Sequence, residues 1–154
     1  LRFVEQYRDT PLVEPLLMHW LANLAKRGKW EMFLTHYDKV TPTKKLACQQ
    51  AYGLYKVGMV DQAMTQAKKL WTVGFSQPDE CDPIFNVWRG ADGITPEIAW
   101  QRFALSLKEN RKDLSSYLIR FVDREDKPYA TNYRLVHLKP TTIKQQPNSN
   151  INNS

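Results

Sequence analysis

The chain has 154 residues, 42% of them apolar and 25% charged, which fits one compact domain or a short segment of helical repeats. No apolar run reaches the roughly 18 residues that a membrane-spanning helix needs, so we expect no membrane span. Its 22 basic and 16 acidic side chains give a net charge of +6. That charge is compatible with nucleic acid, anionic glycopeptide or acidic lipid as partner, and equally with a solvated basic surface.

Proline and glycine positions predict a series of helices in chain order. A capping oxygen followed by proline is typical of a helix start, and it occurs at Thr10-Pro11, Thr41-Pro42, Asp82-Pro83 and Thr95-Pro96. Glycines predict helix stops or tight turns at Gly28, Gly58, Gly74 and Gly90. With the helical spacing of apolar residues, these marks predict helices over residues 1–9, 11–27, 30–38, 42–57, 60–73, 83–90, 96–108 and 111–122.

The predicted helices come in pairs joined by very short turns. The turn at 24–28 recurs 30 residues later at 54–58, and a weaker copy at 106–110 has Asn110 in the place of the glycine. Stacked helical hairpins of this length are typical of an α-solenoid. We therefore predict an all-α fold, a right-handed superhelix of short helical hairpins, with a plain helical bundle as the alternative.

The composition changes after residue 122. Residues 123–128 are polar, 133–138 form a short apolar stretch of undetermined state, and 139–154 are rich in Asn, Gln and Ser. We expect a helical domain over 1–122 and an irregular polar tail over 123–154, which packs along the solenoid or contacts a neighbouring chain. Because the chain starts without Met, we also expect a mature form or a piece of a longer protein.

The sequence offers little catalytic or metal chemistry. His19, His36 and His137 are far apart and have no metal-ligand spacing, so we expect no metal, and no motif for a cofactor is present. Three carboxylates are acid–base candidates by residue type alone, and first-turn positions favour a structural role for two of them. These candidates are Glu31, Glu80 and Glu97.

Tryptophans and cysteines are the other notable residues. The five tryptophans could stack on sugars or bases, but their places on apolar helix faces favour core packing. Basic pairs are scattered and form no tract, so we expect no nucleic-acid partner. Cys48 and Cys81 lie 33 residues apart. They could form one bridge that pins the loop 74–80 to the preceding helix, or remain as two buried thiols.

The stretch from Ala47 to Arg89 resembles the soluble lytic murein transglycosylases. It contains Cys48, a Leu-Trp pair ending at Trp71 and then Ser76-Gln77-Pro78-Asp79-Glu80-Cys81-Asp82, followed by Phe85 and Trp88. The likeness runs back to residue 24 and forward to about 121.

The resemblance implies a superhelical, U-shaped α-domain in the bacterial periplasm, with Cys48 and Cys81 paired in a disulfide. Family members cleave the glycan between N-acetylmuramic acid and N-acetylglucosamine and leave a 1,6-anhydro sugar. A single Glu in a separate lysozyme-like domain does this, and the family hallmarks of that domain (an E-S pair, G-L-M-Q and A-Y-N-x-G) do not occur here. We therefore expect no catalytic residue in this chain.

These observations favour a non-catalytic superhelical segment that serves as scaffold or holds peptidoglycan glycan strands in cell-wall remodelling. The residues that we consider for glycan binding are Trp30, Trp71, Trp88, Arg89 and Trp100. One alternative is a periplasmic repeat adaptor that binds a protein partner. Another is a small complete enzyme that uses one of the three Glu residues above.

Overall fold

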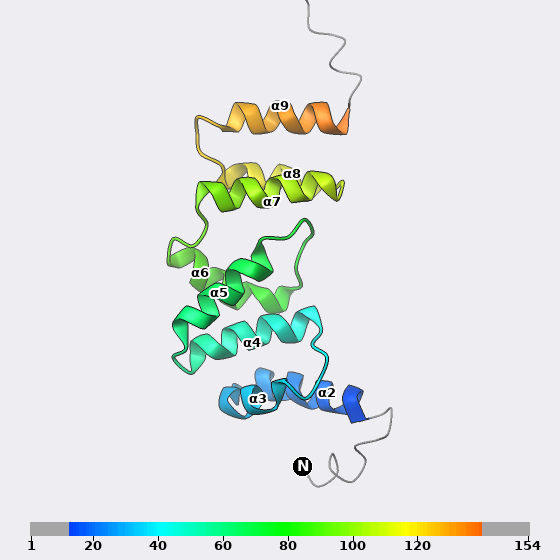
Figure 1. Ribbon diagram of the computed structural model, residues 1–154, viewed down its shortest axis with the longest axis vertical. Coiled ribbons are helices and arrows are strands. Elements are labelled where there is room, and N and C mark those ends of the chain that lie inside the picture. The colour runs from blue at the N-terminus through cyan, green and yellow to red at the C-terminus, as the bar shows by residue number, and fades with distance from the viewer. Residues whose placement is uncertain (1–12, 140–154) are drawn as a thin grey trace, which may run out of the picture. The chain divides into compact units, whose positions relative to one another are not determined.

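The computed structural model describes residues 13–139, so the helix predicted over 1–9 and the tail beyond 139 lie outside the described residues. The described chain forms two compact units, residues 13–71 with 77–93, and residues 72–76 with 94–139. These residues are helical with no strand, which confirms the all-α prediction of helical hairpins (Figure 1).

The helices of the first unit are α2 (Val13–Lys26), α3 (Trp30–Tyr37), α4 (Lys44–Lys56), α5 (Val60–Trp71), the 3-10 turn η1 (Asp79–Cys81) and α6 (Asp82–Gly90). Those of the second are α7 (Pro96–Lys108), α8 (Lys112–Leu118), the 3-10 turn η2 (Ile119–Phe121) and α9 (Lys127–Leu138).

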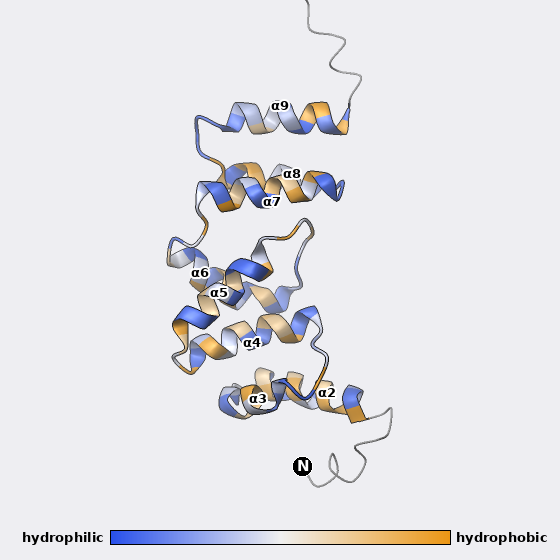
Figure 2. Ribbon diagram, in the orientation of Figure 1, coloured by the Kyte–Doolittle hydropathy of each residue, from blue (hydrophilic) through white to orange (hydrophobic). Residues whose placement is uncertain are grey.

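The first unit is built from the hairpins α2–α3 and α4–α5, with α6 packed on α4 and α5. Apolar and polar residues mix along each helix, as amphipathic helices require (Figure 2). Small residues let α4 and α5 approach closely, since Ala51, Ala63 and Ala67 are all fully buried. The core of the first hairpin consists of Leu17, Leu21, Leu24, Ala25, Phe33, Val40 and Leu46.

The three predicted turns at 24–28, 54–58 and 106–110 are Schellman motifs. After α2, Gly28 has φ +68°, its N–H donates to Ala25 O at 3.0 Å, and the next N–H donates to Leu24 O at 2.9 Å. The same pair of hydrogen bonds follows α4 at Gly58 and α7 at Asn110, where φ is +86° and +53°. The repeat seen in the sequence is therefore one backbone motif that reverses the chain between paired helices.

A fourth copy of this motif follows α6, where the predicted helix stop at Gly90 is confirmed but the left-handed residue lies two positions later. Gly90 is the last residue of α6, and the left-handed residue is Asp92 with φ +53°. Asp tolerates that conformation better than most residues. Gly93 then donates to Trp88 O at 3.0 Å, and a Cβ there would collide with the Trp88 indole.

The predicted helix starts are only partly confirmed. Thr95 caps α7, with Oγ1 accepting from Ile98 N at 3.4 Å. The prediction at Thr41-Pro42 was two residues early, since Thr43 caps α4, while the Thr41 N–H donates to Glu14 Oε1 at 2.7 Å. Asp82 is no cap either, because it follows the turn η1 without a break and is the first residue of α6.

In the second unit, the loop after α5 lies against the end of α7. A Cβ on Gly74 would lie 2.5 Å from Leu105 O, so only glycine fits this approach. Arg102 is buried, its Nη2 donates to Phe75 O at 3.4 Å, and burial lowers its pKa to about 10. It stays charged at neutral pH, and we read it as the polar anchor of this loop on α7.

The helix α9 corrects the prediction of an irregular tail from residue 123. It was missed because only Ala130 of α9 is buried, so its apolar pattern is weak. Polar contacts hold it instead: Arg134 Nε donates to Ser115 Oγ at 3.0 Å, Arg134 Nη2 to Lys112 O at 3.1 Å, and His137 Nε2 to Leu107 O at 3.0 Å. A domain boundary at residue 122 remains a prediction.

Candidate functional site

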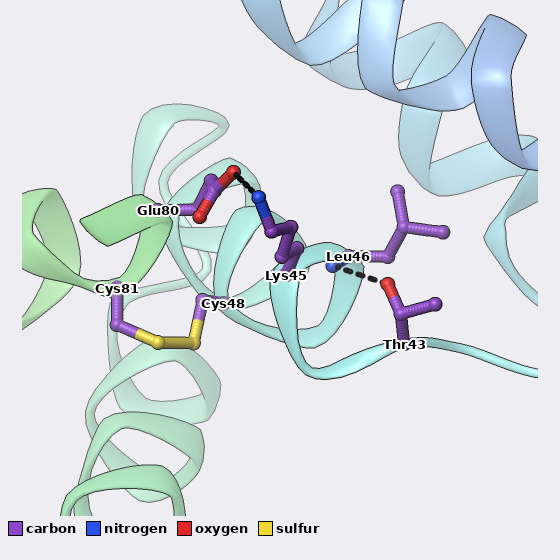
Figure 3. A network of polar contacts seen from close by, with 6 residues as sticks. All are labelled: Thr43, Lys45, Leu46, Cys48, Glu80 and Cys81. Carbon is purple, nitrogen blue, oxygen red and sulfur yellow. Dashed lines mark hydrogen bonds and ion pairs between the residues drawn. A yellow bond between two sulfur atoms is a disulfide. The ribbon is translucent and has the colours of Figure 1, made fainter. Parts of the chain in front are cut away.

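The best-defined side-chain cluster in the first unit surrounds a disulfide. Cys48 on α4 and Cys81 at the end of η1 are both fully buried and joined to each other (Figure 3). This confirms the pairing that the resemblance implied. The bond fastens η1 and the start of α6 to α4 and closes a loop between two residues that are 33 positions apart in sequence. Its role is structural, since both sulfur atoms are used in the bond and neither faces solvent.

An ion pair lies beside the disulfide on the solvent side. Lys45 Nζ is 2.8 Å from Glu80 Oε1, one residue before Cys81 (Figure 3). The hydrogen bond with Lys45 lowers the pKa of Glu80, and the same contact raises the pKa of Lys45. A general acid near neutral pH needs a raised carboxyl pKa. Glu80 is therefore suited to fastening η1 to α4 and unsuited to donating a proton.

The other acid–base candidates have no catalytic setting either. A hydrogen bond from Thr95 lowers the pKa of Glu97 at the start of α7. Glu31 is exposed in the first turn of α3. His36 Nδ1 lies 2.9 Å from Met32 O, so it is used within its own helix. Over residues 13–139, no group of three His, Cys, Asp or Glu is arranged to hold a metal.

Two of the tryptophans considered for glycan binding are core residues. Trp71 and Trp88 are each only 4% exposed, and their rings pack 5.6 Å apart. Rings buried to this degree cannot stack on a ligand from solvent. They join α5 to α6, the core role that their places on apolar helix faces favoured.

The remaining candidates are more accessible but lie apart. Trp100 is half-buried, packs edge-on against Phe103 at 5.4 Å, and its Nε1 is 3.4 Å from Asp126 Oδ2. Arg89 is exposed at the end of α6 and donates to Asn86 Oδ1 at 2.5 Å. Neither lines the two grooves described next.

Trp30 lines an open groove of about 350 Å³ between the start of α3 and the end of α4. Its indole packs edge-on against Tyr52 at 5.5 Å, and Gly53 leaves room for it on α4. The groove carries both signs of charge, two lysines and Glu31. Its lining residues are Gly28, Lys29, Trp30, Glu31, Met32, Lys56 and Val57.

A second open groove, of about 340 Å³, lies on one face of α2 and was missed by sequence reasoning. Its residues recur at the spacing of adjacent helical turns, which could have predicted a shared face. Trp20, which its place on an apolar helix face predicted as a packing residue, does pack against the core of the first hairpin but is only half-buried. The lining residues are Leu16, His19, Trp20, Asn23, Leu24 and Arg27.

Comparison with known proteins relates this chain to one group of enzymes. No family model matches the chain. It is 29% identical over 116 residues, 75% of its length, to the soluble lytic murein transglycosylase of Escherichia coli K12. The corresponding protein of Salmonella typhimurium is 29% identical over 117 residues, 76% of the chain. The chain resembles a segment of the soluble lytic murein transglycosylases.

Solved structures agree with this relation. An inactive mutant of the lytic transglycosylase Slt from Pseudomonas aeruginosa matches 94% of the chain at 28% identity and a TM-score of 0.84. The 70-kDa soluble lytic transglycosylase of E. coli matches 92% at 26% identity and a TM-score of 0.75. The chain spans 18% of the length of the curated transglycosylases and 23% of each solved chain.

The similarity to the lytic transglycosylases thus covers a helical segment and not a whole enzyme. Within residues 13–139, no helix has the length and apolar character needed to cross a bilayer.

Proposed function

We propose that this chain is a non-catalytic helical segment of a periplasmic protein related to lytic transglycosylases, and that it holds peptidoglycan glycan strands. The observation that carries the proposal is the 29% identity to soluble lytic murein transglycosylases over three-quarters of the chain. The matching helical fold, with TM-scores up to 0.84, supports it. All the named relatives are lytic transglycosylases.

The side-chain chemistry of the described residues supports binding over catalysis. The two grooves combine an indole with exposed basic groups, the kind of lining that fits a sugar ring with nearby anions. The net charge of +6 favours an anionic polymer such as peptidoglycan, whose peptides carry carboxylates. The carboxylates of Glu80 and Glu97 have lowered pKa values, the opposite of what a general acid requires.

The disulfide supports a periplasmic location. Disulfides form and persist in oxidising compartments, and the bacterial periplasm is one of them. The Cys48–Cys81 bond is buried in the first unit, where it serves as a permanent part of the structure.

The test is to incubate the purified chain with peptidoglycan sacculi. Co-sedimentation measures binding, and mass spectrometry measures release of 1,6-anhydro muropeptides. We expect binding without release. Release of anhydro products would overturn the non-catalytic assignment and direct attention to glutamine variants of Glu31, Glu80 and Glu97.

A protein-binding adaptor is the second candidate, favoured by the exposed apolar side chains of α9. Tyr129 and Tyr133 are 72% and 58% exposed, and Leu135 and Val136 are also exposed. Exposed apolar side chains gathered on one helix are typical of protein-contact surfaces. A chain that neither binds sacculi nor releases products would favour this function over glycan binding.

A further inference from the structure

We propose that the groove on α2 is a subsite for a carboxylate-bearing glycan, with the sugar on Trp20 and the carboxylate on Arg27. This inference rests on the proposed function and assigns it to one surface. The geometry of α2, the surroundings of Trp20 and the charge of the groove all support it.

The sequence of α2 places the groove residues in one row. Leu16, Trp20, Asn23 and Arg27 follow at intervals of four, three and four residues, which a helix of 3.6 residues per turn brings to one face. Arg27 directly follows the last residue of α2 and continues its hydrogen bonding, since its N–H donates to Asn23 O at 3.0 Å. With a rise of 1.5 Å per residue, the row is ~16 Å long. That length suits an extended ligand lying along the helix. The helical backbone fixes the spacing between the positions of Trp20 and Arg27 before any ligand arrives.

Trp20 is held in place by its neighbours but remains accessible from the groove. Its ring meets His36 of α3 edge-on at 5.2 Å, and it packs against the buried core of the first hairpin. The electron-rich face of an indole attracts the weakly positive C–H groups of a sugar ring. Because packing fixes the indole orientation, little side-chain entropy is lost when a sugar binds.

The polar residues of the groove favour an anion. Arg27, Asn23 and His19 are exposed, and none of the described residues that line the groove is acidic. A guanidinium binds a carboxylate through two parallel hydrogen bonds, and an amide can bind sugar hydroxyls as donor and acceptor. The nearby carboxylate of Glu14 on α2 is outside the groove lining and accepts a hydrogen bond from the Thr41 N–H.

The groove around Trp30 differs on this point. There Glu31 lies among Lys29 and Lys56. Both linings carry one net positive charge, but only the groove around Trp30 contains a carboxylate that would repel a carboxylate ligand, so the groove on α2 is the better candidate for an anionic glycan. The chain thus contains an internal comparison between two grooves of nearly equal volume, about 340 and 350 Å³.

The experiment compares Arg27→Gln with Lys26→Gln in the full 154-residue chain. Both residues are exposed, both variants lose one positive charge, and only Arg27 lines the groove. The probe is a soluble disaccharide peptide from peptidoglycan, with the same compound amidated at its carboxylates as the ligand control. Affinity is measured by calorimetry, and circular dichroism confirms that both variants are folded.

We expect Arg27→Gln to weaken binding of the carboxylated probe roughly tenfold, as loss of a charged hydrogen-bonding partner does. Lys26→Gln should change it less than about twofold. Both variants should bind the amidated probe as the unmodified chain does. Equal losses for the two variants would overturn the proposal, because they would indicate charge attraction without a site.

Sacculi binding separates this inference from the proposed function. If the unmodified chain binds sacculi and Arg27→Gln binds both sacculi and probe equally well, the subsite is wrong and the proposed function stands. If the unmodified chain binds neither sacculi nor probe, the proposed function fails, and the subsite fails with it.

Discussion

At the scale of single residues, the Cys48–Cys81 disulfide should contribute substantially to the stability of the first unit. Replacing Cys48 and Cys81 together with serine should lower the free energy of unfolding by roughly 3–4 kcal/mol, because the unfolded chain regains the freedom of the closed loop. Urea unfolding followed by circular dichroism measures the loss. A reducing agent should destabilise the original chain to a similar degree and leave the serine variant unchanged. An original chain insensitive to reduction would contradict this prediction.

Backbone conformation at two glycines gives a matched pair of substitutions. A Cβ would meet nothing within 4 Å at Gly58 or at Gly90, so crowding is excluded at both. Gly58 has φ +86°, whereas Gly90 is not among the positive-φ residues and ends α6. Gly58→Ala should therefore lower the free energy of unfolding by about 1 kcal/mol. Gly90→Ala should leave the free energy of unfolding unchanged or raise it by up to about 1 kcal/mol. Equal unfolding midpoints for the two variants would refute the argument.

The ion pair of Lys45 and Glu80 makes stability depend on pH. The folded-state pKa of Glu80 is lowered, so its contribution is present above the ordinary carboxyl pKa and is lost as the pH falls through the lowered value. We expect the original chain to lose more stability than Glu80→Gln between pH 7 and about pH 3. Unfolding curves at several pH values test this. Parallel pH profiles would mean that the pair contributes nothing.

At the scale of elements, short helices are ended and reversed by one recurring turn. The Schellman motifs after α2, α4, α6 and α7 satisfy helix carbonyls and use a left-handed residue at Gly28, Gly58, Asp92 and Asn110. After α2, α4 and α7 the next helix begins two residues after the left-handed residue, and this short connection produces the hairpins. After α6 it begins later, at Pro96, so the same motif there ends a helix without forming a hairpin.

The docking of α9 depends on polar contacts more than on apolar burial, and it should respond accordingly. Arg134→Ala removes the hydrogen bonds to Ser115 and Lys112 that join α9 to α8. We expect amide hydrogen exchange within α9 to rise roughly tenfold, since such bonds contribute about 1–1.5 kcal/mol. Arg124→Ala, at an exposed position before α9, is the control and should leave exchange unchanged. Unaltered exchange in Arg134→Ala would mean that apolar contacts hold the helix.

At the scale of the whole molecule, the positive charge should govern attraction to an anionic polymer. The chain carries a net charge of +6. Binding to sacculi should weaken severalfold as salt rises, because the screening length falls from about 10 Å at 0.1 M to about 3 Å at 1 M. Co-sedimentation across a salt series measures this. Binding that does not change with salt would indicate that apolar contacts dominate.

The sequence by itself determined the helices between residues 13 and 121, their paired order and the resemblance to the soluble lytic murein transglycosylases. Helical spacing and glycine turns act over a few residues, so they can be read locally, and the predicted helices from 30–38 to 111–122 match the structure closely. The motif around Cys48 and Cys81 is equally local and specific. The pairing of these two residues followed from the resemblance, since spacing alone left free thiols as an alternative.

Only the tertiary structure decided which side chains are accessible. Trp71 and Trp88 looked no different from Trp20 in sequence, yet contact between α5 and α6 buries the first two. The helix α9 was missed for the same reason, because its partners Ser115 and Leu107 lie 19 and 30 residues away in the chain. Burial and long-range hydrogen bonds depend on how helices pack, which a local pattern does not contain.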